Sequence, residues 1–171
     1  MPYQYRKSPR ADWFEYNEGI YFITICTTDK RHYFGHITDG KMYLSPIGKY
    51  LLDELQNPST HHPHIRIESF VVMPNHLHAI VIVASNTGDT AELTPSNRML
   101  KSLAQKQRPV LSRYIGSLKS AVTKYAHSIG CEFTWQERFH DHIIRGLDDW
   151  QRITEYIEHN IENWGKDCFN E

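Results

Sequence analysis

The chain has 171 residues, of which 40% are hydrophobic and 23% are charged, and its formal net charge is -1. This balance is typical of one globular domain with its own apolar core, and it excludes a disordered or fibrous chain. No run approaches the roughly 20 apolar residues of a membrane-spanning helix, and no apolar signal-peptide core follows Met1, so we expect a cytoplasmic protein that does not contact a membrane.

The near-neutral net charge hides an uneven distribution. Seven Lys and Arg residues and no acid lie between positions 93 and 131, whereas the segment from 147 onward carries seven acids against two bases. Arg6, Lys7 and Arg10 also precede the first acid, Asp12. Such a pattern is typical of a protein that binds a polyanion, although a solvated basic helix face would give the same pattern.

The predicted elements begin with strands. We expect a strand over residues 19–28, where aromatic and β-branched residues dominate, and a hairpin from 32–37 and 41–45 around Thr38-Asp39-Gly40. A helix follows over 45–57, with Ser45 as its N-cap and Pro46 at its first position. Its apolar side is formed by Ile47, Leu51, Leu52 and Leu55.

A second hairpin is predicted from residues 64–73 and 76–84, joined at Pro74-Asn75 and central in the sheet. The polar segment 85–109 is expected to form a surface loop with a short helix over 99–104. A helix over 110–130, a strand over 133–145 and a last helix over 149–164, capped by Asp148 or Asp149, complete the chain. The predicted core stripe of the first of these two helices comprises Leu111, Ile115, Leu118, Val122, Tyr125 and Ile129.

These elements give the order β-ββ-α-ββ-α-β-α in a single domain over residues 1–171, with residues 1–18 as a basic N-terminal arm. Hairpins dominate and the helices come singly. We therefore predict an α+β fold, a ferredoxin-like sandwich with helices packed on an antiparallel sheet. The three cysteines, Cys26, Cys131 and Cys168, are odd in number and lie far apart, which argues for reduced thiols and against a cysteine zinc site.

Two histidines stand at the start of the strand predicted over residues 76–84. Residues two apart in a strand face the same way, so His76 and His78 share one face and could converge on one ion, given a third ligand from whatever packs over them. Histidines that bond to the backbone and bind nothing would give the same pattern. His61, His62 and His64 form a competing group in a turn-like stretch, as do His140 and His142 in a later strand, so spacing alone leaves the choice open.

The last predicted helix offers two further polar groups. Its apolar stripe must pack on the sheet, and at about 100° per residue Tyr156 and Asn160 project beside each other at one margin of that stripe. Asn160 can offer an oxygen to a metal ion, and Tyr156 can offer a nucleophile. A packed tyrosine beside a helix-surface asparagine is the alternative. The stripe consists of Trp150, Ile153, Ile157, Ile161 and Trp164.

These residues resemble the signature of the single-tyrosine HUH transposases, with HLH at 76–78 and YIEHN at 156–160. Further segments resemble the REP-associated tyrosine transposases, an insertion-sequence-200-like branch of that family. They are YRKSPR, GIYFITICT, VVMPNHLHAIV, IGSLKSAVTKYAH, WQERFHDHIIR and YIEHNIENWGKDCFN, which occur in the order of the family and cover nearly the whole chain apart from 85–109. Many members carry proline directly after the amide residue, where this chain has Ile161, so the helix is expected to run further.

The resemblance implies a DNA strand-transferase. Tyr156 would attack a backbone phosphate of single-stranded DNA, form a covalent 5′-phosphotyrosine link and free a 3′-hydroxyl, so that the strand can be rejoined without ATP. A divalent ion, Mg²⁺ or Mn²⁺, would bind His76, His78 and Asn160. The DNA partner would be a hairpin with a short single-stranded guide, and members are described both as monomers and as homodimers. The residues expected to contact DNA are Arg6, Lys7, Arg10, Arg113, Lys119 and Lys124.

Two other hypotheses stay open. A protein of the same ancestry could hold folded single strands without cutting them. An unrelated metal-dependent hydrolase could use one of the histidine groups and a water nucleophile, although no obvious residue serves as its general base. Tyr114 and Tyr125 are rival nucleophiles; we expect Tyr125 to pack in the core and Tyr114 to contact a nucleobase.

Overall fold

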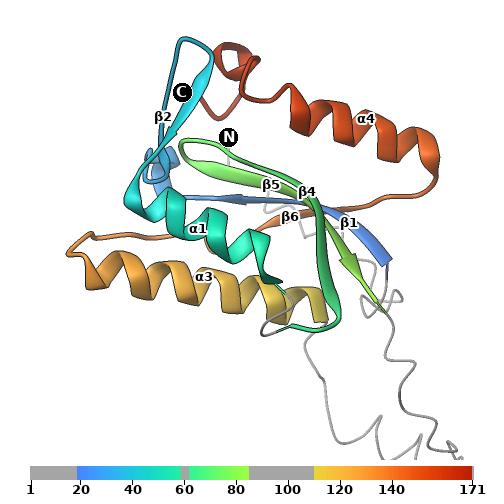
Figure 1. Ribbon diagram of the computed structural model, residues 1–171, viewed down its shortest axis with the longest axis horizontal. Coiled ribbons are helices and arrows are strands. Elements are labelled where there is room, and N and C mark those ends of the chain that lie inside the picture. The colour runs from blue at the N-terminus through green and yellow to red at the C-terminus, as the bar shows by residue number, and fades with distance from the viewer. Residues whose placement is uncertain (1–18, 59–61, 85–109, 171) are drawn as a thin grey trace, which may run out of the picture.

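The computed structural model describes residues 19–58, 62–84 and 110–170. Its strands and helices follow in the predicted order (Figure 1). They are β1 (Gly19–Cys26), the short 3-10 turn η1 (Thr28–Lys30), β2 (Gly35–Thr38), β3 (Lys41–Leu44), α1 (Pro46–Gln56), β4 (Ile65–Val72), β5 (His76–Val83), α3 (Val110–Ser128), β6 (His140–Ile143), α4 (Leu147–Glu158) and the 3-10 turn η3 (Trp164–Lys166). The predicted arm over 1–18 and the predicted loop over 85–109 lie outside the described residues.

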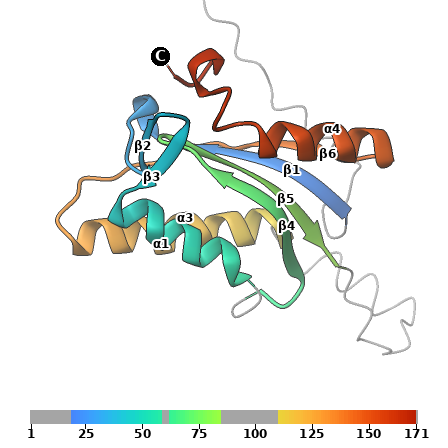
Figure 2. The ribbon, with the colours of Figure 1, turned by 45° about the horizontal axis from the view of Figure 1, so that its top comes forward.

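Four strands form one antiparallel sheet in the order β4-β5-β1-β6. Helix α1 connects β1 to β4 and α3 connects β5 to β6, and both lie on the same face of the sheet, whereas α4 lies on the other (Figure 2). This βαββαβ connectivity is that of the ferredoxin-like sandwich, so the predicted α+β fold is confirmed. The hairpin β2-β3 forms a separate two-stranded sheet, inserted between β1 and α1.

The β4-β5 hairpin turns at Pro74-Asn75 as predicted, but only β5 is central, because β4 is an edge strand. The register pairs β5 with β1 along its whole length, with His78 opposite Thr24 and His76 opposite Cys26. A register shift between Ile67 and Ser69 marks an irregularity in β4. The central position of β5 gives its first residues a rigid neighbour on each side.

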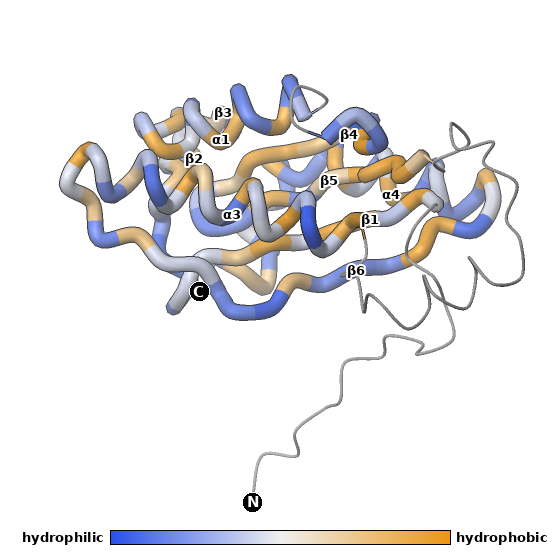
Figure 3. The backbone as a smooth tube through the Cα atoms, turned by 90° about the horizontal axis from the view of Figure 1, so that it is seen from below, coloured by the Kyte–Doolittle hydropathy of each residue, from blue (hydrophilic) through white to orange (hydrophobic). Residues whose placement is uncertain are grey.

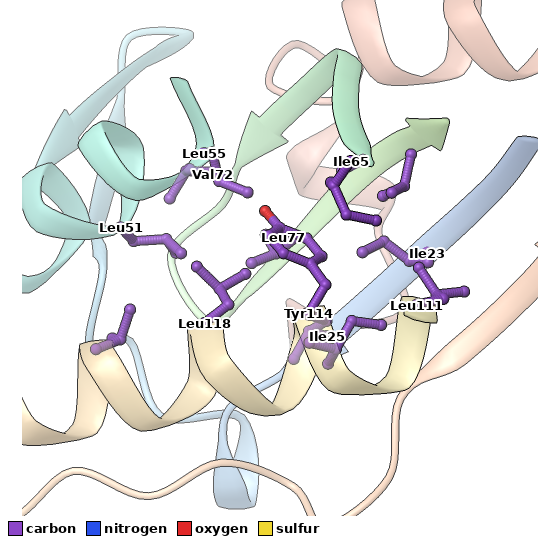
Figure 4. Packing of buried hydrophobic residues seen from close by; sticks show 14 of the residues in the cluster. Ile23, Ile25, Leu51, Leu55, Ile65, Val72, Leu77, Leu111, Tyr114 and Leu118 are labelled. Carbon is purple, nitrogen blue, oxygen red and sulfur yellow. The ribbon is translucent and has the colours of Figure 1, made fainter. Parts of the chain in front are cut away.

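One face of the sheet packs on α1 and α3 and forms the larger apolar core. Leu77, Ala79, Val81 and Val83 of β5 are all buried on this face. Figure 4 shows Leu77 among buried side chains of α1 and α3. Burial of a large aliphatic side chain contributes about 1.5–3 kcal/mol, so this layer is the main source of stability. Its helix residues include Leu51, Leu55, Leu111, Ile115, Leu118 and Val122, whereas Leu52 of the predicted stripe is only partly buried.

Helix α1 begins as predicted. Ser45 is its N-cap and its Oγ accepts a hydrogen bond of 3.0 Å from the backbone N–H of Gly48. A Cβ atom at Gly48 would lie 2.1 Å from the carbonyl oxygen of Phe34, so only glycine allows the helix to pack this closely.

Helix α3 differs from its prediction at two positions. Ile129 is 47% exposed because the helix ends at Ser128 and Gly130, with a φ of 76°, turns the chain away. Tyr114 is 2% exposed, so the prediction that it contacts a nucleobase is wrong. Tyr125 is partly buried and stacks on Tyr50, with ring centroids 4.3 Å apart, as expected for a packing residue.

The C-terminal elements are shorter than predicted. Strand β6 is confined to His140–Ile143, and residues before it make only an isolated bridge between Thr27 and Trp135. Helix α4 begins at Leu147 with Gly146 as its N-cap, so Asp148 and Asp149 lie in its first turn and are not caps. It ends at Glu158, because tight i to i+3 hydrogen bonds such as Asn160 N–H to Ile157 O replace the helical pattern.

The second face of the sheet packs on α4 through a smaller apolar cluster. Ile80 of β5 lies there against Ile153 and Ile157 of α4 and Trp164 of η3. His76 and His78 continue the same face toward the start of β5, beside this cluster. No helix in the described part of the chain is both long and apolar enough to cross a membrane. The three cysteines form no disulfide bond among the described residues.

Candidate active site

His76 and His78 lie together at the start of β5, on the face covered by α4. Their side chains are 0% and 2% exposed, and their ring centroids are 4.6 Å apart. Both histidines belong to an otherwise apolar central strand, where the alternation of side chains places them on one face. The two rings thus form the convergent pair that the sequence predicts.

The orientation of His76 is fixed by Asn75. The Asn75 amide nitrogen donates to two carbonyl oxygens, those of Lys30 at 3.1 Å and Phe169 at 2.7 Å. Its amide oxygen must therefore accept from Nδ1–H of His76, which lies 2.8 Å away. This leaves a lone pair on Nε2 of His76, and that atom is buried without a hydrogen-bond partner among the described residues.

The orientation of His78 is fixed by β1. Its Nδ1 lies 2.8 Å from Thr24 Oγ1, and its ring stacks on Phe22 with centroids 5.3 Å apart. Its Nε2 lies 3.2 Å from the hydroxyl oxygen of Tyr156 in the same chain. The imidazole is therefore held between two strands and the final helix, with Nε2 directed at the phenol.

Both imidazoles are neutral over the ordinary pH range. Burial, helped by the neighbouring His78, lowers the pKa of His76 to about 2, and burial lowers the pKa of His78 to about 4. A neutral imidazole with Nδ1 engaged offers its Nε2 lone pair to a cation.

Tyr156 reaches His78 from α4, and Asn160 is a hydrogen-bond partner of Tyr156. Tyr156 lies in the last turn of α4 and is 45% exposed, so an external molecule can reach its ring. Burial raises the pKa of Tyr156, while a hydrogen bond with the Asn160 side chain opposes that rise. Asn160 is 3% exposed, and its Oδ1 has no hydrogen-bond partner among the described residues.

Asp167 is a site residue that sequence reasoning missed. Its Oδ2 lies 3.9 Å from Nε2 of His76, and its side chain is 7% exposed. One ligand atom from each of His76, His78 and Asp167 lies within 4.8 Å of the other two. The turn η3 brings Asp167 there, and no periodic spacing links it to Tyr156, so no sequence signal marks it.

The donor set fits a divalent metal ion. Unpaired buried acceptors cost about 1–3 kcal/mol each, and a cation would satisfy the one on Nε2 of His76. Two imidazole nitrogens and a carboxylate form a mixed nitrogen and oxygen set that suits Mn²⁺ and, less well, Mg²⁺. Among the residues that the structure describes, no other three His, Cys, Asp or Glu side chains bring their ligand atoms as close together as His76, His78 and Asp167 do.

The competing histidine groups have other contacts. The ring of His62 packs edge-on against Tyr114, with centroids 5.4 Å apart, and His61 lies outside the described residues. His142 forms an ion-pair contact of 2.7 Å with Asp149. Neither group gathers three ligands within the described part of the chain.

The three basic residues predicted to contact DNA that the structure describes lie away from the histidines. Arg113, Lys119 and Lys124 lie on α3, on the face of the sheet opposite α4. Lys119 donates to the carbonyl oxygen of Gln136 at 2.7 Å, and burial lowers its pKa. Arg6, Lys7 and Arg10 fall outside the described residues. The role of all six in DNA binding stays a prediction.

Comparison with known proteins identifies one relative in sequence. An uncharacterized protein of Haemophilus influenzae (strain ATCC 51907 / DSM 11121 / KW20 / Rd) is 36% identical over 169 residues, which cover 95% of this chain and 92% of the relative. No model of a known protein family matches the chain.

Two solved structures are similar to the chain. The first, a REP-associated tyrosine transposase bound to a REP hairpin, has a TM-score of 0.60 at 20% identity and covers 96% of this chain and 75% of its own. At this identity the similarity establishes a shared fold. The second, a candidate transposase from Deinococcus radiodurans R1, has a TM-score of 0.47 at 14% identity over 90% of this chain and 96% of its own, which is too low to support an argument.

Proposed function

We propose that this chain cleaves and rejoins single-stranded DNA at hairpin-associated sites. The chain belongs to one family with the Haemophilus influenzae protein, and it has the fold of the REP-associated tyrosine transposase. The proposed intermediate is a covalent 5′-phosphotyrosine at Tyr156. The observation that carries the proposal is the contact of 3.2 Å between the Tyr156 hydroxyl and His78, beside buried acceptors that lack a donor.

The position of Tyr156 supports its role as nucleophile. Its ring is 45% exposed, so a DNA phosphate can approach it, while the hydroxyl points toward the buried histidines. The free phenol is a weak nucleophile because its pKa is near 10, and burial raises the pKa of Tyr156 further. The hydrogen bond with Asn160 favours the phenolate and partly offsets this effect.

The proposed metal ligands are His76, His78 and Asn160, to which the geometry adds Asp167. When bound, a divalent ion supplies Lewis-acid polarisation of the phosphate and stabilises the negative charge that develops there. Asn75 and Thr24 hold the two imidazoles by their Nδ1 atoms, which directs both Nε2 atoms to the same side.

The cleavage step balances without an external energy source. The Tyr156 oxygen forms a bond to phosphorus as the bond between phosphorus and the 3′ oxygen breaks. The leaving oxygen takes a proton to become a 3′-hydroxyl, and the phenol proton passes to solvent. Attack by a 3′-hydroxyl on the phosphotyrosine reverses the step and rejoins a strand, because the phosphodiester energy is kept in the covalent link.

The proposal is tested with a labelled pool of hairpin oligonucleotides whose single-stranded flanks are randomised. We expect a covalent protein–DNA adduct on a denaturing gel in Mn²⁺, and none with Tyr156→Phe. Tyr43→Phe is the matched control, because Tyr43 is 50% exposed on β3 and its ring stacks on His36, which is not a residue of the candidate site.

The same assay separates the alternatives. Persistence of the adduct in Tyr156→Phe would show that the nucleophile is another residue. Tight hairpin binding with no adduct in Mn²⁺ or Mg²⁺ would instead favour a binding protein that does not cut. Strand cleavage that releases product without any adduct would favour a hydrolase with a water nucleophile.

A further inference from the structure

A second polar cluster lies next to the candidate active site. It consists of His142 on β6 and Asp149 and Arg152 on α4. In Figure 3, β6 is mostly hydrophilic, unlike the central strands β1 and β5. Strand β6 is also an edge strand, paired with β1 alone within the sheet. The cluster therefore stands at a margin of the sheet where no further strand pairs within the described part of the chain.

Asp149 holds the other two members of the cluster. Its Oδ2 lies 2.7 Å from Nε2 of His142, and its Oδ1 accepts a hydrogen bond of 2.5 Å from the Arg152 guanidinium. The hydrogen bond with His142, supported by Arg152, lowers the pKa of Asp149 to about 2, so the carboxylate is ionised throughout the ordinary pH range. The Arg145 backbone N–H also donates to it at 3.3 Å.

The sheet register places His142 on the same face as the active site. His142 is directly opposite Phe22, and opposed residues in an antiparallel pair project to the same side. The Phe22 ring in turn stacks on His78 and meets Tyr156 edge-on, with centroids 6.0 Å apart. Phe22 thus pairs with His142 in the sheet and contacts the ring of the candidate nucleophile.

The helix places Arg152 in line with the nucleophile. Residues 149, 152 and 156 are spaced i, i+3 and i+7, so they follow one another along a single side of α4. A rise of about 1.5 Å per residue puts Arg152 about 6 Å and Asp149 about 10 Å from Tyr156 along the helix axis. At about 3.4 Å per stacked nucleotide, this distance corresponds to two or three nucleotides.

We propose, on the premise of the proposed function, that Arg152 binds a backbone phosphate of the DNA strand two or three nucleotides from the phosphate attacked by Tyr156. The Arg152 side chain is 72% exposed, so it can contact a strand. A guanidinium has five N–H donors, and the bond to Asp149 leaves others for a phosphate. Asp149 is a positioning residue that fixes the guanidinium before the DNA arrives, and His142 holds the Asp149 carboxylate in place through Nε2.

The sign of the Asp149→Asn effect separates this role from general electrostatics. Removing a negative charge near a DNA site strengthens binding if only the net charge matters. If Asp149 positions the guanidinium that binds the phosphate, its loss weakens binding instead. Asp148→Asn is the matched control, because Asp148 lies in the same first turn of α4, is exposed, and carries the same charge.

The experiment measures binding of the hairpin pool, and the rate of adduct formation, at several salt concentrations. We expect Asp149→Asn and Arg152→Gln to weaken binding by roughly tenfold, and Arg152→Gln to reduce the slope of log affinity against log salt by about 0.7. Arg152→Lys should recover part of the loss. Arg66→Gln, on the opposite edge strand β4 and paired with Glu68 at 2.7 Å, should change binding little. Melting temperatures verify that each variant is folded.

The outcomes separate the two proposals. If Asp149→Asn and Asp148→Asn behave alike, or if Arg152→Gln binds as tightly as the parent, the phosphate contact is wrong even when the parent forms an adduct. If the parent binds but forms no adduct, while Asp149→Asn weakens binding and Asp148→Asn does not, the contact stands and the cleavage chemistry fails. A parent chain that binds no hairpin overturns both.

Discussion

The two faces of β5 differ although they belong to the same eight residues. On one face, Leu77 and its alternate neighbours are fully enclosed by α1 and α3. On the other, His76 and His78 lie beside a smaller apolar cluster, with an acceptor that has no protein donor in the described structure. Buried polar groups without partners lower the free energy of unfolding, so the apolar packing against α1 and α3 must offset the cost of the histidine face. Stability and chemistry are thus separated by the alternation of side chains along one strand.

The largest effect is expected on the apolar face. Leu77→Ala should lower the free energy of unfolding by about 2–5 kcal/mol, because it leaves a cavity in a layer that is 0% exposed at this position. Urea unfolding in the presence of a chelator measures this. Tyr156→Phe on the other face should change the same quantity by less than about 1 kcal/mol, since it removes one half-exposed hydroxyl. Equal losses in the two variants would contradict the division between the faces.

Metal binding is expected to act only through the polar face. Mn²⁺ at a hundred times its dissociation constant should stabilise the folded chain by about 2.7 kcal/mol. His76→Gln should remove most of this gain, because it replaces the unpaired Nε2 ligand. Asp167→Asn should reduce the gain, whereas His62→Gln should not alter it. Thermal unfolding with and without Mn²⁺ gives the comparison, and full stabilisation of His76→Gln would exclude the proposed ligand set.

Acid should destabilise the metal-free protein through the same two histidines. Their folded pKa values, about 2 and about 4, lie below the unfolded value near 6.5, so the unfolded chain binds more protons between these limits. Their contribution is fully present above pH 6.5 and is lost as the pH falls through the folded values. Protonation of the two histidines in the unfolded chain should lower the free energy of unfolding by about 2 kcal/mol between pH 6.5 and pH 5.5. Urea unfolding with a chelator measures this change. His78→Gln should remove about half of this decrease, and an unchanged decrease would argue that other groups cause it.

The smallest effect is expected at the start of α1, on the apolar side. Ser45→Ala removes the cap that accepts from Gly48 and should cost about 1 kcal/mol of folding free energy. The affinity for Mn²⁺ and the rate of adduct formation should stay unchanged, because α1 packs on the face away from the histidines. A change in either would mean that the two faces are coupled.

Local patterns in the sequence predicted most of this architecture. Alternation along β5 predicted which side of the strand carries His76 and His78, and the Ser45-Pro46 pair predicted the start of α1. Helical periodicity also predicted that Tyr156 and Asn160 lie on one side, and the structure joins their side chains by a hydrogen bond, with the Tyr156 hydroxyl 3.2 Å from His78. These features depend on neighbours a few residues apart, which the sequence shows directly.

Features set by tertiary contacts were not predictable in this way. The periodic stripe implied that the last helix runs to Trp164, but it ends at Glu158, where tight turns and the packing of Trp164 take over. Those turns carry Asp167 to the histidines, so the same error concealed a candidate ligand. Likewise, the burial of Tyr114 follows from the packing of α1 against α3, which a single helical stripe does not reveal.

The most direct test of the account is to map the covalent bond itself. The adduct formed with the hairpin pool in Mn²⁺ is digested with protease and nuclease, and the modified peptide is sequenced by mass spectrometry. We predict a nucleotide joined through its 5′ phosphate to Tyr156, within the peptide that also contains Asn160. A nucleotide on any other residue, or the absence of a modified peptide from a folded chain that cleaves the DNA, would contradict it.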